Sequence, residues 1–572
     1  MAKNRPVNAA CAGARRVPLA ALPTLCVLAA ATGCGSHALP HRLEPIPYAD
    51  TLPSQQPAAR TPSEVERLLD ASVSGQIGHA LSIRRLLGAE HEALNVTRSD
   101  NVVNSAWFEH RNGRRRMSPA EIARGPSTGG PDTDNTLTVI AGTTAGLSGG
   151  FTVRDAQGNT FLFKFDPKGN PQLGSAASVI SSRLFWAAGY HTPEDRIVVF
   201  DAARLALDPE ATIETDLGAR PMSEGDIALV LEGTDALPDG RYMALSSKYP
   251  PGTPLGPFLF SGVRADDPND WYRHEYRREL RGLYVLSSWL NHVNIRFTST
   301  MDVFIDPPGY VRHYLIDFAA TLGSGEIRPR RPREGTEYNF DIWATLGRVL
   351  SFGFLEMGWE DARYEEIHPT IGWMPVETFD PGSWRPNWPN QAFNNRTARD
   401  GYWGAKLVGS FSNEQIAAAV QAGRLPAKAA AALTEILIRR RDKVISYWYA
   451  QVTPIENVDV TLLRGAASSI LELSFDDLGL VAGVWDPEGT RYFWHFDDPA
   501  SGTRGRGDRA ARAGARQAVS IEPRRTPGDD RSADKEFAIL RLVASREGAT
   551  SRAATVYLSW DGSEYRVVGL EH

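Results

Sequence analysis

The sequence predicts an α+β protein with a β-rich N-terminal part, a helical middle part and an all-β C-terminal domain. Three observations support this prediction. Short β-branched and aromatic runs lie between residues 101 and 200, helical periodicity dominates from 249 to 451, and alternation with period two returns from residue 452. The length of 572 residues agrees with several folded units, because one domain holds roughly 150 residues.

The composition is that of an ordinary globular protein. The net charge is −6, with 23% charged and 42% hydrophobic residues. Proteins that bind nucleic acid carry a basic excess that neutralises phosphates. We therefore expect no nucleic-acid partner.

The first 34 residues have the pattern of an export signal. Basic residues precede an apolar run from Val17 to Ala31, and small residues then lead to Cys34. The sequence Ala31-Thr32-Gly33-Cys34 resembles the lipobox of bacterial lipoproteins, which implies that Cys34 becomes the lipidated first residue of the mature protein. A plain signal peptide or a short membrane anchor is the alternative, although the run is short for a transmembrane span.

The cysteines agree with export. All three, Cys11, Cys26 and Cys34, lie in this first segment, so we expect no disulfide in the folded part. We expect a membrane-anchored lipoprotein in the periplasm or at the cell surface. Its expected partners are the membrane, through the lipid at Cys34, and an unidentified protein of the envelope. Residues 35–60 predict a flexible tether, and Thr61-Pro62-Ser63-Glu64 predicts the start of a helix.

A glycine-rich turn precedes a strand that carries a lysine. Strands are predicted at residues 137–140, 151–153 and 160–165. The loop before the second strand contains Gly146, Gly149 and Gly150, and the third strand contains Lys164. Glycines there would let the backbone approach phosphates, and Lys164 would pair with those phosphates. A lysine in an apolar strand also needs a partner for its charge.

A helix is predicted from Ser175 to Gly189, followed by a strand at residues 197–200. The first turns of this helix contain Ser178 and other small residues, and no Glu that could pair with Lys164. A Pro-rich segment at 250–257 then predicts a rigid hinge. A further helix, from Glu275 to Trp289, leads into the next motif.

The stretch from Trp289 to Ser324 has the outline of a phosphoryl-transfer site. An apolar run delivers Asp317, followed by Phe318, in the manner of a D-F-G turn whose Asp binds Mg²⁺. His292 marks a loop of the H-x-D-x-x-x-x-N kind, in which the Asp accepts a hydroxyl proton and the Asn binds a second Mg²⁺. Those two positions hold Asn294 and Ser299.

These replacements affect catalysis more than binding. An Asn cannot accept a proton as a carboxylate does, and general-base catalysis contributes about 10² to 10⁴-fold. Asn294 is therefore a degenerate base position, and Ser299 is a degenerate metal position with a shortened oxygen ligand. Asp302 is a candidate substitute carboxylate, although it lies on a strand and turn segment.

The order of these motifs resembles a known group of proteins. The motifs are F-L-F-K-F-D-P-K-G, S-R-L-F-W-A-A-G-Y, D-D-P-N-D-W-Y-R-H-E-Y-R-R-E-L-R-G-L, W-L-N-H and H-Y-L-I-D-F-A-A-T-L-G-S. Together they resemble exported bacterial proteins with an atypical protein-kinase-like fold, related to the CotH-type and HipA-type kinases. The resemblance covers residues 101–449. It implies a two-lobed fold, with Lys164 as the phosphate lysine, Asp317 as the metal ligand, and ATP and Mg²⁺ as ligands. The group has other residues at four matching positions: Asp where this chain has Asn294, Asn where it has Ser299, Gly where it has Ala319 and Glu where it has Ser178.

Two functions remain open. The first is a pseudokinase, a binding or scaffold module that retains nucleotide binding at most. The second is an active ATP- and Mg²⁺-dependent phosphotransferase that uses Lys164 and Asp317. A third interpretation, an unrelated α+β protein, would be supported if Lys164 and Asp317 lay far apart.

The rest of the chain completes the domains. A buried helix is predicted from Asp341 to Phe354, and the Trp- and Pro-rich residues 371–389 predict an ordered loop or a glycan- or partner-binding surface. The C-terminal strands predict a small β-sandwich with a binding or structural role. The predicted domains are a signal segment (1–34), a tether (35–60), a helix with the small lobe (61–248), a hinge with the helical lobe (249–451), and a β-sandwich (452–572) with a mobile insert (501–534).

Overall fold

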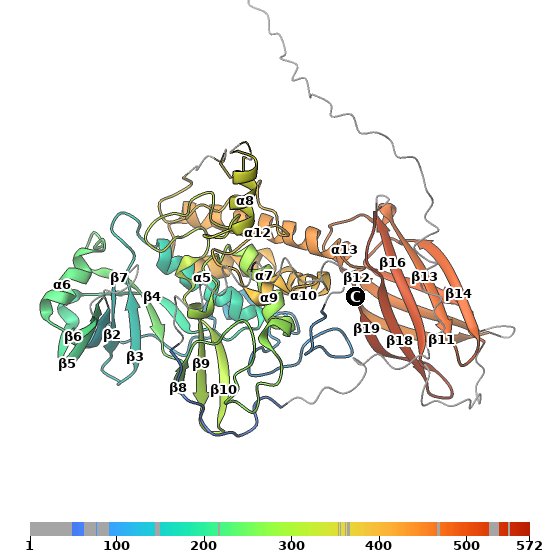
Figure 1. Cartoon of the computed structure of the whole chain (residues 1–572), viewed down its shortest axis with the longest axis horizontal. Helices are drawn as coiled ribbons and strands as arrows, with labels where there is room; N and C mark the ends of the chain where they lie inside the picture. Colours follow the sequence, from blue (N-terminus) through green and yellow to red (C-terminus); the bar gives the residue numbers. More distant parts are fainter. Residues whose placement is uncertain are drawn as a thin grey trace, which may run out of the picture.

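The computed structural model describes residues 49–61, 76, 91–143, 149–215, 218–352, 354, 356–357, 359–360, 362, 366–465, 469–524, 537–546 and 549–572. The expected signal segment with Cys34, the helix expected after Thr61, and Gly146 lie outside these residues. The chain has a mixed α/β architecture in which a block of helices separates a sheet at one end from further sheets at the other (Figure 1). No helix of the described part is long and apolar enough to cross a membrane.

The N-terminal sheet has the strand order β4-β7-β3-β2-β1-β5-β6. The strands predicted at residues 137–140, 151–153, 160–165 and 197–200 are all present in it. Its core is rich in phenylalanine, including Phe151, Phe163 and Phe200. The strands are β1 (Leu137–Thr143), β2 (Gly150–Arg154), β3 (Thr160–Lys164), β4 (Glu194–Phe200), β5 (Leu205–Thr215), β6 (Gly218–Pro221) and β7 (Tyr242–Lys248).

Helix α5 (Leu173–Ala188) confirms the helix predicted from Ser175 and packs against β4 and β7. The Asp166 carboxylate accepts hydrogen bonds from the backbone amides of Gly174 and Ser175 (2.7 and 2.9 Å). These bonds satisfy amides that have no partner within the helix, and the negative charge suits the N-terminal end of the helix. The shorter elements nearby are α4 (Pro119–Arg124), η4 (Ala202–Arg204) and α6 (Glu224–Glu232).

The middle part combines helices with a small sheet of order β10-β9-β8. Strand β8 lies in the Pro-rich segment predicted as a hinge. The elements are β8 (Thr253–Gly256), η5 (His274–Tyr276), α7 (Arg278–Trp289), η6 (Phe297–Ser299), β9 (Thr300–Ile305), β10 (Tyr310–Leu315), η7 (Phe318–Ala320), α8 (Ile342–Leu350), α9 (Gln391–Asn394), α10 (Ala398–Gly409), α11 (Asn413–Ala422) and α12 (Ala427–Tyr449).

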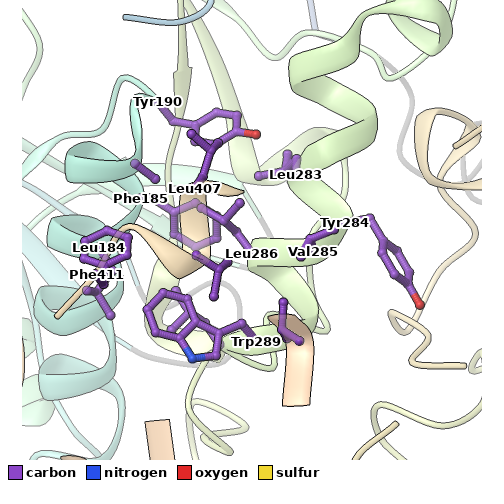
Figure 2. Close-up of a cluster of buried hydrophobic side chains, with 14 of the residues drawn as sticks. Leu184, Phe185, Tyr190, Leu283, Tyr284, Val285, Leu286, Trp289, Leu407 and Phe411 are labelled. Carbon is purple, nitrogen blue, oxygen red and sulfur yellow. The ribbon is translucent and has the colours of Figure 1, made fainter. Parts of the chain in front are cut away.

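Helix α7 lies at the centre of the largest hydrophobic core. Its residues Leu283, Leu286 and Trp289 pack in one cluster with Phe185 of α5 and Phe411 (Figure 2). Fully burying a large apolar side chain contributes about 1.5 to 3 kcal/mol. The cluster therefore fixes α5 and α7 relative to each other, and α7 leads directly into the loop that contains His292.

The C-terminal part contains two antiparallel sheets, of orders β11-β12-β15 and β14-β13-β16-β18-β19. Side chains of both sheets, among them Phe475 and Leu540, share one hydrophobic cluster. The elements are β11 (Ile455–Arg464), β12 (Ser469–Asp477), α13 (Leu478–Val481), η8 (Pro487–Gly489), β13 (Thr490–Asp498), β14 (Thr503–Ala510), β15 (Arg516–Ile521), β16 (Ala538–Arg546), β17 (Ala549–Thr550), β18 (Ala554–Trp560) and β19 (Tyr565–Glu571).

The prediction of a mobile insert at residues 501–534 is wrong for its first part, because β14 and β15 lie there. Strand β14 has the sequence T-R-G-R-G-D-R-A, and its inward positions alternate with exposed Arg and Asp. An edge strand with glycines on its inner face lacks the apolar residues from which strands are recognised. The composition of β14 therefore does not predict a strand, and its extended conformation depends on pairing with β13.

The prediction of a free tether at residues 35–60 is also wrong for the part that the structure describes. The backbone amide of Ser54 donates to the Gly309 carbonyl (2.7 Å), and that of Arg60 donates to the Leu255 carbonyl (2.9 Å). Residues 49–60 thus lie along the small sheet of β8 to β10. The low hydrophobicity of this segment did not reveal its position, because it is held by hydrogen bonds and ion pairs to distant residues such as Asp266, Asn269 and Asp302 rather than by apolar burial.

Helix α8 exists but is not buried. Its last two residues, Val349 and Leu350, are exposed, and Phe352 just after the helix is 91% exposed. Apolar periodicity predicts a helix with one apolar face, but it does not determine what packs against that face. The prediction of a helix here is therefore confirmed, but the prediction that this helix is buried is wrong.

The close approach of α7 and α10 gives a test of the core. A Cβ at Gly404 would lie 2.6 Å from the Gly282 carbonyl oxygen and 2.9 Å from Val285. We expect Gly404→Ala to lower the free energy of unfolding by about 1 to 3 kcal/mol, because the helices must move apart. Chemical denaturation measures this change. Gly489→Ala is the control, since no atom lies within 4 Å of its added Cβ, and an equal loss in both variants would contradict the prediction.

Candidate functional site

Lys164 and Asp317 meet, although 153 residues separate them in the sequence. The Lys164 Nζ donates a hydrogen bond of 3.0 Å to the Asp317 Oδ1. Lys164 is the last residue of β3, and Asp317 follows β10 with a left-handed backbone (φ 60°). The two side chains are 34% and 28% exposed, so solutes can reach them. An unrelated α+β fold would have been supported if these two residues lay far apart. They are in contact, so that support is absent.

The two groups hold each other in the charged state. The charge of Asp317 raises the pKa of Lys164, against the opposing effect of burial. Burial acts to raise the pKa of Asp317, but the charge and the hydrogen bond of Lys164 outweigh it, and the pKa is lowered overall. An ammonium and a carboxylate therefore stand side by side at neutral pH.

The described glycines of the turn adjoin Lys164. Gly150 lies directly opposite Lys164 in the ladder of β2 and β3. A Cβ at Gly150 would overlap the Phe163 carbonyl oxygen, so only glycine allows this close approach. At Gly149, an added Cβ would lie 3.4 Å from the side chain of Val230. Gly149 and Gly150 thus lie beside the strand that carries Lys164, and their role in binding phosphates stays a prediction.

His292 is a packing residue. Its ring lies 6.0 Å from that of Phe185 and 5.7 Å from that of Phe318, measured between ring centroids. Burial lowers its pKa to about 3, so the imidazole is neutral at any physiological pH. The ring connects α5 to the turn after Asp317, a structural role rather than metal binding.

The loop after His292 ends beside the residue that precedes Asp317. The backbone amide of Ile316 donates to the Ser299 carbonyl (2.9 Å), which ties the end of this loop to the residue before Asp317. The Ser299 hydroxyl donates to the Asn294 carbonyl (2.8 Å), and Ser299 is buried. The Ser299 hydroxyl, which occupies the position expected for a metal ligand, therefore forms a hydrogen bond within its own loop.

Asp302 lies in a buried ion cluster. Its oxygens contact Arg264 (2.9 Å), His313 (2.7 Å) and Arg60 (3.6 Å), and its side chain is fully buried. Burial acts to raise its pKa, but His313 and Arg264 reverse this, and the pKa is lowered. A carboxylate held in this way cannot reach a substrate hydroxyl. The structure thus gives Asp302 a structural role instead of the role of a substitute base.

Two further carboxylates face this site and were not predicted. Asp195 of β4 accepts a hydrogen bond from Ser178 of α5 (3.1 Å) and another from Ser247 of β7. Burial, and then the charge of Asp317, raise the pKa of Glu326. Asp195 could have been found from the sequence, because it is an aspartate at the start of an apolar strand. For Glu326, a loop residue, the sequence contains no comparable signal.

The donor set fits a nucleotide with Mg²⁺. Among the described residues, no group of three or more His, Cys, Asp or Glu could hold a metal ion. Mg²⁺ needs no such group, because one or two carboxylates and the phosphates of a substrate usually bind it. Asp317 would hold the cation and Lys164 the phosphates, and a bound Mg²⁺ supplies neutralisation of phosphate charge.

Comparisons with known proteins add little to these contacts. No protein-family model matches the chain, and no curated protein matches it. A solved crystal structure of a Golgi casein kinase matches with 9% sequence identity and a TM-score of 0.28. The match covers 67% of this chain and 88% of that chain. Its TM-score is too low to support an argument about fold or function.

The buried Asp195 predicts an unusual dependence of stability on pH. Burial raises its pKa from 3.8 to about 6, so the folded state binds this proton more tightly than the unfolded state, and stability falls as pH rises from 4 to 6. We expect Asp195→Asn to raise the free energy of unfolding by about 3 kcal/mol above pH 6 and by nothing near pH 4. Urea denaturation at pH 4 and pH 8 measures this. A gain of the same size at both values would contradict the prediction.

Proposed function

We propose that this protein is an exported, membrane-anchored pseudokinase: a two-lobed kinase-like domain that binds a nucleotide with Mg²⁺ through Lys164 and Asp317 but does not transfer phosphate. The observation that carries the proposal is the 3.0 Å contact between Lys164 and Asp317 beside a loop whose base position holds Asn294. The domain then acts as a binding or scaffold module. The C-terminal sheets, as a β-sandwich, provide a further binding or structural unit.

The binding function is supported by the order and contacts of the elements. A glycine turn, a strand lysine and a metal-binding aspartate are the parts that hold phosphates and cation in phosphoryl-transfer proteins. Here Gly150 pairs with Lys164, and Lys164 contacts Asp317. Both charged side chains are partly exposed. A small lobe formed by the N-terminal sheet with α5, and a large lobe formed by α7 to α12, would place this contact between them.

The absence of phosphotransfer is supported by the loop beside Asp317. Asn294 has no carboxylate, and the Ser299 hydroxyl is bound to the Asn294 backbone. The candidate substitute, Asp302, is enclosed by cationic side chains. Loss of a general base lowers the rate about 10² to 10⁴-fold. Loss of the second metal ligand reduces the stabilisation of phosphate charge further.

Export and anchoring are supported by the first 34 residues. A basic start, a short apolar run and small residues before Cys34 fit a lipoprotein signal. The concentration of all three cysteines in this segment fits the same interpretation. Nucleotides are scarce outside the cytoplasm, and this favours a binding or scaffold role over repeated transfer of phosphate from ATP.

Nucleotide binding tests the proposal directly. At a concentration of 100 times Kd, a ligand stabilises the folded state by about 2.7 kcal/mol. We expect ATP with Mg²⁺ to raise the melting temperature of the wild type by several degrees, and Asp317→Ala to abolish the shift because the cation loses its carboxylate. Asp459→Ala, which removes an exposed carboxylate paired with Arg516 in the C-terminal sheet, should leave the shift unchanged.

Transfer of labelled phosphate separates the two functions. A pseudokinase gives no labelling of itself or of added protein acceptors above the Asp317→Ala background. Labelling that Asp317→Ala abolishes would show an active phosphotransferase and would contradict the proposal. Absence of any nucleotide-dependent shift in the wild type would contradict nucleotide binding.

A further inference from the structure

A cavity of about 450 Å³ lies between residues 332–337 and the Trp- and Pro-rich residues 371–389. Neither Lys164 nor Asp317 belongs to its lining, so it is separate from the candidate nucleotide site. Pockets for small molecules have volumes of roughly 300 to 1,000 Å³, and they are lined by aromatic and apolar side chains with a few polar groups. The cavity has this size, and the proposed function gives it no role.

The walls of the cavity are aromatic. The aromatic side chains that line it are Trp359, Trp373, Phe379 and Trp384. Their neighbours fix their orientation: the indole of Trp359 donates to Glu337 (2.7 Å), and the Arg440 guanidinium lies 3.5 Å from the ring centroid of Phe379. Rings that are already fixed lose little conformational freedom when a ligand stacks on them. The walls therefore suit a ligand with a flat apolar face.

Asn291 brings an unused hydrogen-bond donor to the cavity. It is 4% exposed, and its Oδ1 accepts a hydrogen bond from the Trp384 Nε1 (2.9 Å). An indole nitrogen can only donate, so its partner is the amide oxygen, and the Asn291 Nδ2 has no acceptor among the described residues. A Cβ at Gly335 would lie 2.9 Å from the same Oδ1, so the glycine leaves room for this arrangement. A buried amide without an acceptor is suited to a ligand oxygen.

Two charged residues of the lining are paired with residues outside it. Glu337 contacts Arg333 (3.2 Å) and Arg348 (3.3 Å), and Arg385 contacts Asp341 (2.6 Å). None of these three partners lines the cavity. An ion pair that is already formed has little charge left for a ligand. Glu337 and Arg385 therefore do not select a charged ligand.

The same holds for Glu334 and Arg440. Glu334 contacts Arg328 and Arg330 (3.5 Å each), which also lie outside the lining. Arg440 donates to the last two backbone carbonyls of α7 (2.6 and 2.9 Å), where a cation is favourable. The lining thus offers no unpaired cation to a phosphate or a carboxylate.

Further polar groups lie at the rim of the cavity. Thr378, Asp380 and Ser383 line it and are exposed, so the cavity opens to solvent there. The hydroxyls of Thr378 and Ser383 have no hydrogen-bond partner among the described residues. Asp380 accepts a hydrogen bond from the Gly382 amide (2.9 Å) through one oxygen, which leaves its other oxygen for a ligand. Small hydroxyl, amide and carboxylate groups around aromatic rings match a molecule that has many hydroxyls and an apolar face.

We propose that this cavity binds an uncharged carbohydrate the size of a mono- or disaccharide. A sugar ring places its C–H face on Trp373, the partly buried indole of the wall, and a hydroxyl accepts a hydrogen bond from the Asn291 amide. Thr378, Asp380 and Ser383 bind further hydroxyls at the rim, where a longer glycan leaves the cavity. The inference goes beyond the proposed function and does not depend on nucleotide binding.

Saturation-transfer difference NMR on the full chain tests the site with a defined panel of sugars. The panel contains glucose, galactose, mannose, N-acetylglucosamine, cellobiose and chitobiose, each at about 10 mM, which detects a Kd in the millimolar range. We expect at least one sugar to receive saturation from the protein, and a titration of that sugar gives its Kd. No transfer to any member of the panel would overturn the proposal.

Trp373→Ala and Trp388→Ala form a matched pair that locates the bound sugar. Both tryptophans are partly buried in residues 371–389, but only Trp373 lines the cavity. We expect Trp373→Ala to raise the Kd about tenfold, because the sugar loses its stacking surface, and Trp388→Ala to change it less than about twofold. An equal rise in both variants would report a general disturbance of this segment and would overturn the assignment to the cavity.

A second variant leaves the aromatic walls and the core unchanged. The double substitution Thr378→Val and Ser383→Ala removes two exposed hydroxyls, and we expect it to raise the Kd about tenfold with an unchanged melting temperature. A Kd equal to that of the wild type would contradict binding at this rim.

Two charged probes test the chemistry of the ligand. Glucose 6-phosphate carries a phosphate, and choline carries a quaternary ammonium group that aromatic cages recognise. We expect neither to bind more tightly than the best neutral sugar, because the charges of the lining are paired. Tighter binding of either probe would show a site for an anion or for a cation, and it would overturn the assignment to an uncharged carbohydrate.

Discussion

The burial of α7 is the constraint on which the rest of the structure depends. All its residues are buried, including charged ones, and a buried charge must be paired. Arg278 contacts Asp100 (3.0 Å) and Asp400 of α10 (2.6 Å). Asp100 also contacts Arg399 (2.9 Å) and His572 at the C-terminus (3.1 Å). Pairing the charges of one helix thus fixes α10, the segment before the N-terminal sheet and the end of the C-terminal sheets.

The same helix positions the candidate site. It leads into the loop that contains His292, and the His292 ring packs between α5 and the turn after Asp317. Helix α5 in turn lies on the sheet face that carries Lys164 and Asp195. Packing therefore fixes the backbone next to each of the two residues, Lys164 and Asp317, that form the contact. A rigid frame of this kind is what holding phosphates and a cation requires, even where no proton is transferred.

The sequence predicted strands β1 to β4 of the N-terminal sheet, α5 and α7, because each of these has a local periodicity of its own. It also assigned Lys164 and Asp317 to one site through the resemblance to kinase-like proteins, but it did not predict the ion pair between them. It did not reveal relations that arise only in three dimensions. The enclosure of Asp302 by Arg264 and His313 joins separate segments, as does the approach of Asp195 to Ser178. Strand β14 was missed for a different reason, since its glycines give no apolar signal and its neighbour β13 determines it.

Asp302 and Asp195 show how environment separates two buried aspartates of the same chemistry. Asp302 has Arg264, His313 and Arg60 around it, and its pKa is lowered. Asp195 has two serine hydroxyls, and burial raises its pKa to about 6. The first arrangement stabilises the fold, whereas the second costs stability whenever the group is charged. Functional sites retain groups that stability alone would remove, and this costly carboxylate lies on the sheet face that carries Lys164.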